Sequence, residues 1–189
     1  MDLDSKVEGK LKEKAIFYTE QSRPDWNIPH LNAAIYYMKE LIKNEDGDPK
    51  ILLPAIYLHD IGYAGFLKKG YTFEDNLKAK EEHMIRGAKL SKALLKDLNY
   101  FSPEEIDKIS KLIEMHDNLN KIRNSEAQLV FEADSLGQVD IKRVRPNFDR
   151  ENYLKWLADF KKRRVPLFKT RTGLEILKKL LPVAENFFD

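Results

Sequence analysis

Two residue types in this chain could together bind a metal ion. Histidine occurs four times, each time in an apolar segment that reads as helix, at His30, His59, His83 and His116. Two aspartates have similar surroundings, since Asp60 directly follows His59 in LPAIYLHDIGY and Asp134 lies in FEADSLG. Neutral imidazole nitrogens and carboxylate oxygens both donate electron pairs to borderline or hard divalent metals. These residue types therefore favour a divalent metal site.

The two aspartates strengthen this interpretation. A single histidine on an apolar helix face is usually a core residue with hydrogen-bonded ring nitrogens. A buried ionised carboxylate needs a partner, because removing it from water is costly. Helical periodicity directs Asp60 and Asp134 inward, and we expect few inward-facing cations to balance them. A divalent metal would compensate both acids and use the imidazoles in their neutral form.

The adjacent pair His59–Asp60 leaves two arrangements open. Neighbouring side chains on a helix diverge by about 100°, so they seldom reach one point. Gly62 follows closely and loosens the backbone, which would let both side chains turn toward a common centre. Alternatively, Asp60 bridges two metals and His59 binds only one of them. The dipeptide itself is weak evidence, because His116–Asp117 is a second example.

Helices must position these side chains. Apolar residues recur with helical spacing along nearly the whole chain, and no segment shows the alternation of a strand. Ser102, Pro103 and Glu105 form a capping-box signal for a helix start. We expect an all-α protein with helices over residues 5–21, 29–44, 51–60, 77–98, 103–116, 126–137, 150–162 and 171–187, and an irregular loop over 66–76 containing Gly70.

Length and composition bound the alternatives. At 189 residues the chain suits a single domain, and its lack of cysteine excludes disulfides, zinc–thiolate sites and a thiol nucleophile. The charged start MDLDSKVEGKLKEKA lacks the apolar stretch of a secretory signal, and no apolar run reaches membrane-spanning length. We therefore expect a soluble, cytoplasmic protein with no membrane contact. No GxSxG elbow, P-loop or Rossmann glycine pattern is present.

The order of these residues resembles the HD superfamily of metal-dependent phosphohydrolases. The resemblance rests on an early helical histidine, then HDIG, HMIRGAKL, LIEMH and FEADSLG, over about residues 25–137. It implies one HD-type helical bundle over 1–189, with a basic helical C-terminal extension over about 141–189. The metal ligands it implies are His30, His59, Asp60 and Asp134. By the same resemblance, His83 and His116 hold a second metal or the substrate phosphate.

The resemblance also implies an activity. A metal-activated water held by His59 and Asp60 would cleave the phosphoester of a nucleotide or another small phosphorylated metabolite. The cofactor would be one or two divalent ions of manganese, iron, cobalt, nickel or zinc. Arg86, one turn beyond His83, is a candidate contact for the substrate phosphate. His116 is followed by Asp117 and no GYP signature accompanies HDIG, so cyclic-di-GMP is not the expected substrate.

Other interpretations stay open at this point. The same six residues could hold two irons in an HD-type oxygenase. Thirteen Lys and Arg against four Asp and Glu over residues 141–179 indicate either a solvated helix surface or an anion-attracting field around Lys161, Lys162, Arg163 and Arg164. A non-catalytic module that binds nucleotides or nucleic acid is therefore a third interpretation, beside the phosphohydrolase and the oxygenase. A homodimer through Phe168, Phe187 and Phe188 is another expectation, although core packing would explain these aromatics equally well.

Overall fold

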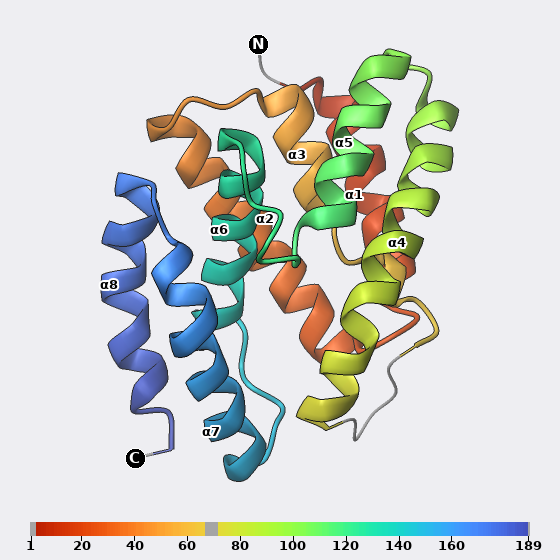
Figure 1. The fold of residues 1–189 in the computed structure, drawn as a ribbon. Coiled ribbons are helices and arrows are strands. Elements are labelled where there is room, and N and C mark those ends of the chain that lie inside the picture. The colour runs from red at the N-terminus through yellow and green to blue at the C-terminus, as the bar shows by residue number, and fades with distance from the viewer. Residues whose placement is uncertain (1–2, 67–71, 189) are drawn as a thin grey trace.

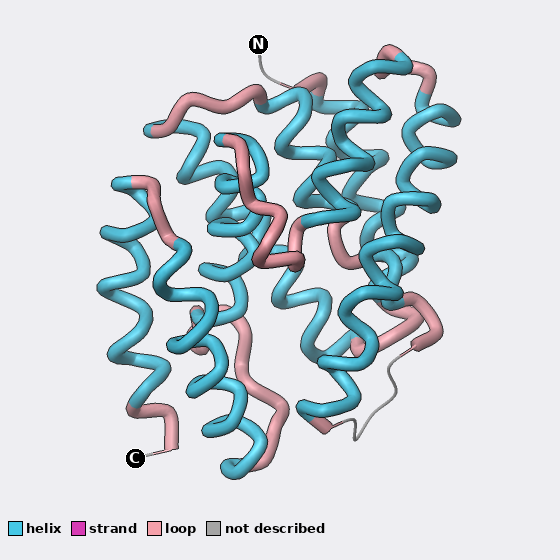
Figure 2. The backbone as a smooth tube through the Cα atoms, in the orientation of Figure 1, coloured by secondary structure: helices cyan, strands magenta, loops and turns pink. Residues whose placement is uncertain are grey.

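The described part of the chain folds into helices and loops. The structure is a computed structural model and describes residues 3–66 and 72–188. Within these ranges there is no strand, as Figure 2 shows. The all-α prediction is confirmed.

Eight α-helices and three short helical turns make up the described part of the chain. The α-helices are α1 (Ser5–Thr19), α2 (Pro24–Asn44), α3 (Pro49–Leu58), α4 (Phe73–Leu98), α5 (Pro103–Met115), α6 (Ser125–Val139), α7 (Arg150–Asp159) and α8 (Arg171–Glu185). The short turns are the 3-10 helix η1 (Ile61–Tyr63), the π-helix η2 (Phe160–Arg164) and the 3-10 helix η3 (Val165–Leu167). Figure 1 shows that α7 and α8 stand together on one side of the molecule, while α4 and α5 stand on the other.

Helix starts follow the local capping chemistry. The expected capping box at α5 is present: Ser102 N–H donates to Glu105 at 2.7 Å, and the Ser102 hydroxyl accepts from Glu105 N–H at 3.3 Å. A second capping box, between Thr72 and Asp75, starts α4 at residue 73 rather than 77. The expected loop is correspondingly shorter, and its residues 67–71, including Gly70, lie outside the described residues.

The start of α2 differs from the prediction in a way that matters for the site. The helix begins at Pro24, where the missing N–H of proline costs no intrahelical bond, so Pro29 lies inside the helix. The extra turn places Trp26 on the helix that carries His30 and makes Arg23 the N-cap residue of that helix.

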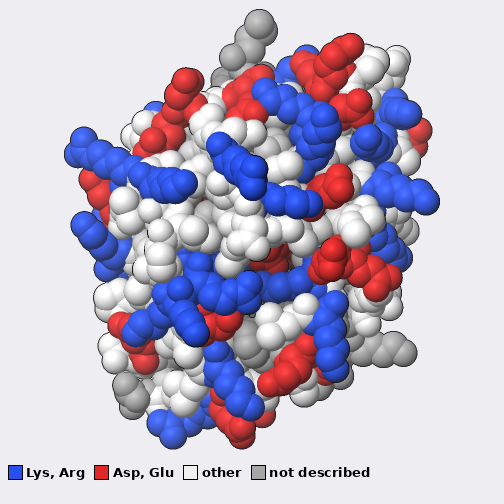
Figure 3. All heavy atoms as spheres, viewed as in Figure 1, with Lys and Arg blue, Asp and Glu red and all other residues white. Residues whose placement is uncertain are grey.

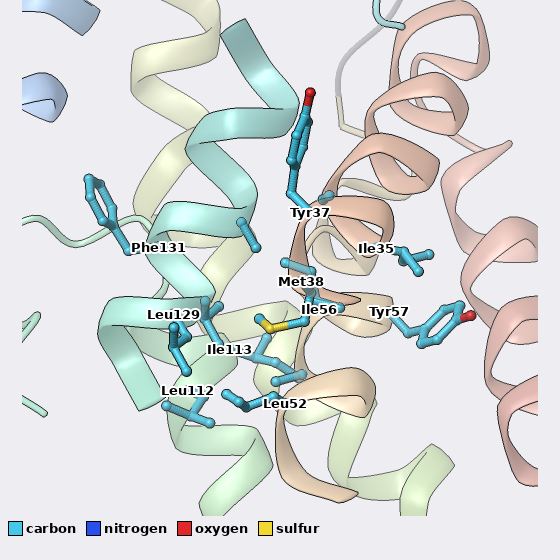
Figure 4. Packing of buried hydrophobic residues seen from close by; sticks show 14 of the residues in the cluster. Ile35, Tyr37, Met38, Leu52, Ile56, Tyr57, Leu112, Ile113, Leu129 and Phe131 are labelled. Carbon is cyan, nitrogen blue, oxygen red and sulfur yellow. The ribbon is translucent and has the colours of Figure 1, made fainter. Parts of the chain in front are cut away.

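Helix α3 lies at the centre of the core. All of its residues from Ile51 to Leu58 are buried, because α1, α2, α5 and α6 pack around it. Figure 4 shows Met38 of α2, Ile56 of α3 and Ile113 of α5 meeting in the space between these helices. A helix that is apolar on every side has no solvated face, so its last turn ends inside the protein. His59 and Asp60 follow directly from that buried end.

The C-terminal helices pack on the same core. Glu132 of α6 is fully buried and accepts hydrogen bonds from the backbone N–H groups of Lys169 at 2.8 Å and Thr170 at 3.0 Å. The Thr170 hydroxyl and the Gln128 amide also donate to this carboxylate. These bonds attach the start of α8 to α6, against which α8 packs. The extension is therefore tied to the residues that precede it.

The aromatics considered for a dimer are mostly used within the chain. Phe168 is buried against Phe131, and Phe187 packs against Tyr153. Phe188 is 39% exposed. The homodimer stays a prediction.

The described helices include none that is both long and apolar enough to cross a membrane.

Candidate metal centre

Six residues from five helical segments converge at the buried end of α3. Five of them are buried, and the sixth, Asp60, has a side chain that is 13% exposed. Each sits where its helix faces the core or ends in it: His30 on α2, His59 and Asp60 after α3, His83 on α4, His116 after α5 and Asp134 on α6. The structure thus brings together all the residues that the sequence singled out as metal ligands.

The first group of donor atoms gathers around one oxygen of Asp60. His30 Nε2 lies 3.2 Å from His59 Nε2 and 3.1 Å from Asp134 Oδ1. Asp60 Oδ2 lies 3.6 Å from the His30 nitrogen and 3.5 Å from the His59 nitrogen. His59 Nε2 and Asp134 Oδ1 are 3.7 Å apart. The His30 and His59 nitrogens thus have Asp60 Oδ2 and Asp134 Oδ1 as neighbours, each within 3.7 Å of both rings.

The second group gathers around the other oxygen of the same aspartate. His83 Nε2 and His116 Nε2 are 3.3 Å apart. Asp60 Oδ1 lies 3.5 Å from the His83 nitrogen and 3.6 Å from the His116 nitrogen. Asp60 thus directs one oxygen at each histidine pair. His59 Nε2 and Asp60 Oδ2 do turn toward a common point, as the first arrangement that the sequence left open requires, while Asp60 Oδ1 faces the second histidine pair, as the other requires.

These spacings suit metal ligands. Two ligand atoms about 2.1 Å from one ion stand about 3.0 Å apart in octahedral geometry and about 3.4 Å apart in tetrahedral geometry. In the first group each carboxylate oxygen lies 3.1 to 3.7 Å from the two ring nitrogens, which are 3.2 Å apart. In the second group the range is 3.3 to 3.6 Å. Imidazole and carboxylate are also the donor types that manganese, iron, cobalt, nickel and zinc accept, so the six residues fit a divalent metal.

Backbone carbonyls orient three of the four rings. A ring whose Nδ1–H donates to a carbonyl keeps its Nε2 lone pair free for a metal. The Nδ1 atoms in such contacts are those of His59 with Ile56 O at 2.8 Å, His116 with Ile113 O at 2.8 Å, and His83 with Ala79 O at 3.3 Å. All three acceptors lie three or four residues earlier on the same helix, so the helices themselves set the tautomers.

His30 is held in a different way. Its Nδ1 is buried and finds no hydrogen-bond partner among the described residues. Trp26 stacks on the ring at a centroid distance of 4.6 Å. A Cβ added at Gly137 would lie 3.3 Å from His30 Nδ1 and 3.0 Å from Ala34 N, so a glycine at this position leaves room for the ring.

The electrostatic environment keeps the acids ionised and two of the rings neutral. Burial lowers the pKa of His59 and of His83, which favours the neutral ligand form. Burial acts to lower the pKa of His116 as well, but the surrounding aspartates raise it above its ordinary value. Burial acts to raise the pKa of Asp60, yet the neighbouring imidazoles hold it well below its usual range. The ionised carboxylates therefore give the centre negative charge that a divalent ion would neutralise.

Arg164 corrects the expectation that inward-facing cations are scarce. It belongs to the basic run at 161–164, but its side chain is only 3% exposed, whereas the three residues before it are exposed. Its guanidinium donates to Asp134 Oδ2 and to Asp117 Oδ1, at 2.6 Å in each case. Burial acts to raise the pKa of Asp134, but Arg164 and the nearby histidines hold it well below its usual range. Arg164 follows the apolar Phe160 by four residues, about one helical turn. This spacing is the sequence signal that could have indicated that Arg164 is buried.

A small cavity opens onto the cluster. Its volume is about 50 Å³, and its lining includes Asp60, His116 and Asp134. Three cationic side chains also line it, those of Arg23, Lys80 and Arg164, together with aromatic rings that include Trp26, Tyr63, Tyr153, Trp156 and Phe160. Figure 3 shows a band of Lys and Arg atoms across the middle of one face, with Asp and Glu atoms in the hollow beside it.

The structure does not bring Arg86 to this cavity. Its side chain is exposed on α4, and its guanidinium lies over the Phe66 ring, 4.8 Å from the centroid. The cations that do line the cavity come from the N-cap of α2, from α4 and from η2. Sequence reasoning missed Arg23 because it placed the start of α2 at Pro29.

Comparison with known proteins gives one match. Residues 29–137, more than half of the chain, match the family model described as HD domain. No curated protein matches the chain, and no solved structure does. The matched segment contains all six residues of the cluster, and it ends before the segment that contributes Arg164.

Proposed function

The chain belongs to the HD domain family, and we propose that it is a metal-dependent phosphohydrolase acting on a nucleotide or another small phosphorylated metabolite. One observation carries the proposal: Asp60 lies between two histidine pairs and directs a different carboxylate oxygen at each. This arrangement would give two divalent ions a shared ligand, which is a common design of enzymes that cleave phosphoesters.

The roles of the six residues follow from their groups. His30, His59 and Asp134 would hold one ion, and His83 and His116 the other, with Asp60 shared. When bound, such ions supply Lewis acids for the phosphoryl oxygens and acidify a water for attack on phosphorus. The protein's part is to hold the ligands in place and to keep the His59 and His83 imidazoles neutral, which their burial favours by lowering the pKa of each.

The cavity lining supports an anionic substrate. Arg23, which contacts the Trp26 and Tyr63 rings, places a positive charge at the cavity wall that would attract a phosphate. Lys80 and Arg164 also line the cavity, where they are paired with Asp117 and Asp134. Aromatic side chains stack well on nucleobases, which favours a nucleotide among phosphorylated metabolites.

The two alternative functions, an oxygenase and a non-catalytic binding module, differ in how they would use the residues of the site and the cavity. An HD-type oxygenase with two irons would use the same six ligands, and the feature that favours an anionic substrate over an uncharged one is the charge of Arg23 at the cavity wall. A non-catalytic binder would not require four oriented histidines around two acids. Hydrolysis of an anionic ester uses both features, so we favour it.

The test is release of inorganic phosphate from a panel of nucleoside monophosphates and p-nitrophenyl phosphate. Purified protein would be assayed with manganese, iron, cobalt, nickel or zinc, beside Asp60→Ala and the control Asp107→Asn, which changes an exposed acid paired with Lys92. We expect metal-dependent release by wild type and Asp107→Asn, and loss of at least about a hundredfold in Asp60→Ala.

The same samples separate the alternatives. Iron-dependent oxygen consumption without phosphate release would favour the oxygenase. Equal phosphate release by Asp60→Ala and wild type would show that the assigned centre is not the catalytic one. Salt-sensitive binding of RNA or DNA in the absence of metal, with no turnover, would favour the binding module.

A further inference from the structure

We infer that Arg164, which follows the HD-domain match, is a positioning residue that fixes how Asp134 faces the metal centre. The inference rests on the proposed metal-dependent function, because it concerns one ligand of that centre. It assigns the C-terminal extension a part in the site, beyond covering the core.

Asp134 has its two oxygens in different surroundings. Oδ2 accepts from Arg164 Nη2 at 2.6 Å, whereas Oδ1 lies 3.1 Å from His30 Nε2 and 3.7 Å from His59 Nε2. The Gln138 amide donates to both oxygens at 3.0 Å. A carboxylate held in this way presents one oxygen to the ion and cannot rotate to present the other.

The guanidinium is itself fixed on all of its nitrogens. Nε donates to Ser135 Oγ at 3.0 Å, and Nη1 donates to Asp117 Oδ1 at 2.6 Å. Its plane lies near the Phe131 ring, with 5.1 Å between Cζ and the centroid. Lys80 Nζ holds the second oxygen of Asp117 at 2.9 Å. A planar fork can satisfy two acids at once in this geometry, which an ammonium group cannot do.

A purely structural role would be redundant. The extension is already anchored by buried Glu132, which accepts from Thr170 and the backbone at the start of α8. Buried ion pairs are also weak sources of net stability, because desolvation offsets much of the attraction. The strong geometric consequence of Arg164 is at Asp134, where it determines the orientation of a proposed metal ligand. Residues that orient ligands in this way typically change metal affinity about 10- to 100-fold when they are replaced.

The experiment is a Co²⁺ titration of the full chain, followed by visible absorption and by competition with a chromophoric chelator. Arg164→Gln removes the charge and the fork, and Arg164→Lys keeps the charge alone. Arg163→Gln is the matched control, since this neighbouring arginine is 49% exposed and contacts Asp159 at 3.5 Å. Far-ultraviolet circular dichroism checks that each variant retains its helical content.

We expect Arg164→Gln to bind the Co²⁺ ion beside His30, His59 and Asp134 about 10- to 100-fold more weakly than wild type, with altered d–d bands. Arg164→Lys should restore part of the affinity without restoring the wild-type spectrum, because one ammonium cannot hold Asp134 and Asp117 together. Arg163→Gln should match wild type in both measurements. If Arg164→Gln does not fold, Arg164→Lys against Arg163→Gln carries the test.

Two different results would contradict the positioning role of Arg164 and the metal-dependent function. A wild-type protein that binds Co²⁺, together with a folded Arg164 variant of unchanged Kd and spectrum, would overturn the positioning role alone. A wild-type protein that binds no Co²⁺ would overturn both the positioning role and the metal-dependent function.

Discussion

Replacement of Gly62 by alanine tests how the turn after Asp60 sets the spacing of the centre. Gly62 lies in η1, which packs against the backbone of α4. A Cβ at this position would overlap the His83 carbonyl oxygen and stand 2.6 Å from Gly87 N and 2.8 Å from His83 C. A Cβ at Gly87 would stand 3.4 Å from Gly62 N, which is an ordinary van der Waals distance. Gly62 is therefore the glycine that lets the turn and the helix meet through their backbones.

The clash has a definite size. Non-bonded heavy atoms are most stable at 3.5–4.0 Å, so η1 and α4 would have to separate by about 1.5 Å to clear the His83 carbonyl oxygen. Inserting a methyl group into a packed site costs about 1–3 kcal/mol, and we expect the upper end because the neighbours here are backbone atoms. The same movement would draw His83 away from Asp60, from which its Nε2 lies 3.5 Å. A shift of that size is large for a metal ligand.

Urea denaturation and metal analysis measure the two consequences. Gly62→Ala should lower the free energy of unfolding by about 2–3 kcal/mol and should lose the ion held by His83 and His116. Gly9→Ala is the matched control, because a Cβ there meets nothing within 4 Å on α1. It should raise stability by about 0.5–1 kcal/mol, since alanine is the better helix former. Gly62→Ala protein with wild-type stability and metal content would refute this account of the turn.

Two further predictions concern stability away from the centre. Lys39 and the Tyr57 hydroxyl contact the carboxylate of Glu8 at 2.6 and 2.8 Å. Burial acts to raise the pKa of Glu8, but these two contacts outweigh burial and lower the pKa from its ordinary value of 4.5. Its stabilisation is then complete above pH 4.5 and is lost as the pH falls through the folded-state pKa, so Glu8→Gln should cost about 1 kcal/mol at pH 7 and almost nothing near pH 2. Urea titrations at both pH values measure the difference, and an equal cost at both would contradict the role of the charge. Glu132→Ala should lower stability by about 3 kcal/mol or more in thermal unfolding, because it leaves buried donors at the start of α8 unpaired; a loss below about 1 kcal/mol would show that the anchor is dispensable.

The helices and the inward direction of the ligands could be predicted from the sequence. Helical periodicity is a local property, and it placed His30, His83 and Asp134 on inner faces as the structure has them. Capping chemistry is also local, which is why the start of α5 at Pro103 was found. The position of Asp60 between two histidine pairs follows from how four helices pack, and no local pattern could choose it over a single centre.

The contribution of the extension could not be predicted for a similar reason. Arg164 stands in a run of four basic residues, and composition alone indicates a solvated surface there. Its burial depends on Asp117 and Asp134, which lie 47 and 30 residues earlier in the chain. The dipeptide His116–Asp117 is weak evidence in the sequence, but in the structure the pKa of Asp117 is lowered to about 2. Burial acts to raise this pKa, and Lys80 and Arg164 outweigh that effect.

The most direct test of the central claim is the metal content of protein purified without chelator and reconstituted with manganese, iron, cobalt or zinc. Elemental analysis should find about two ions per chain in wild type, about one in His83→Ala, and fewer than one in Asp60→Ala, since Asp60 is the shared ligand. Wild-type protein without metal after reconstitution, or Asp60→Ala with the wild-type content, would contradict the assignment of this cluster as a two-metal centre.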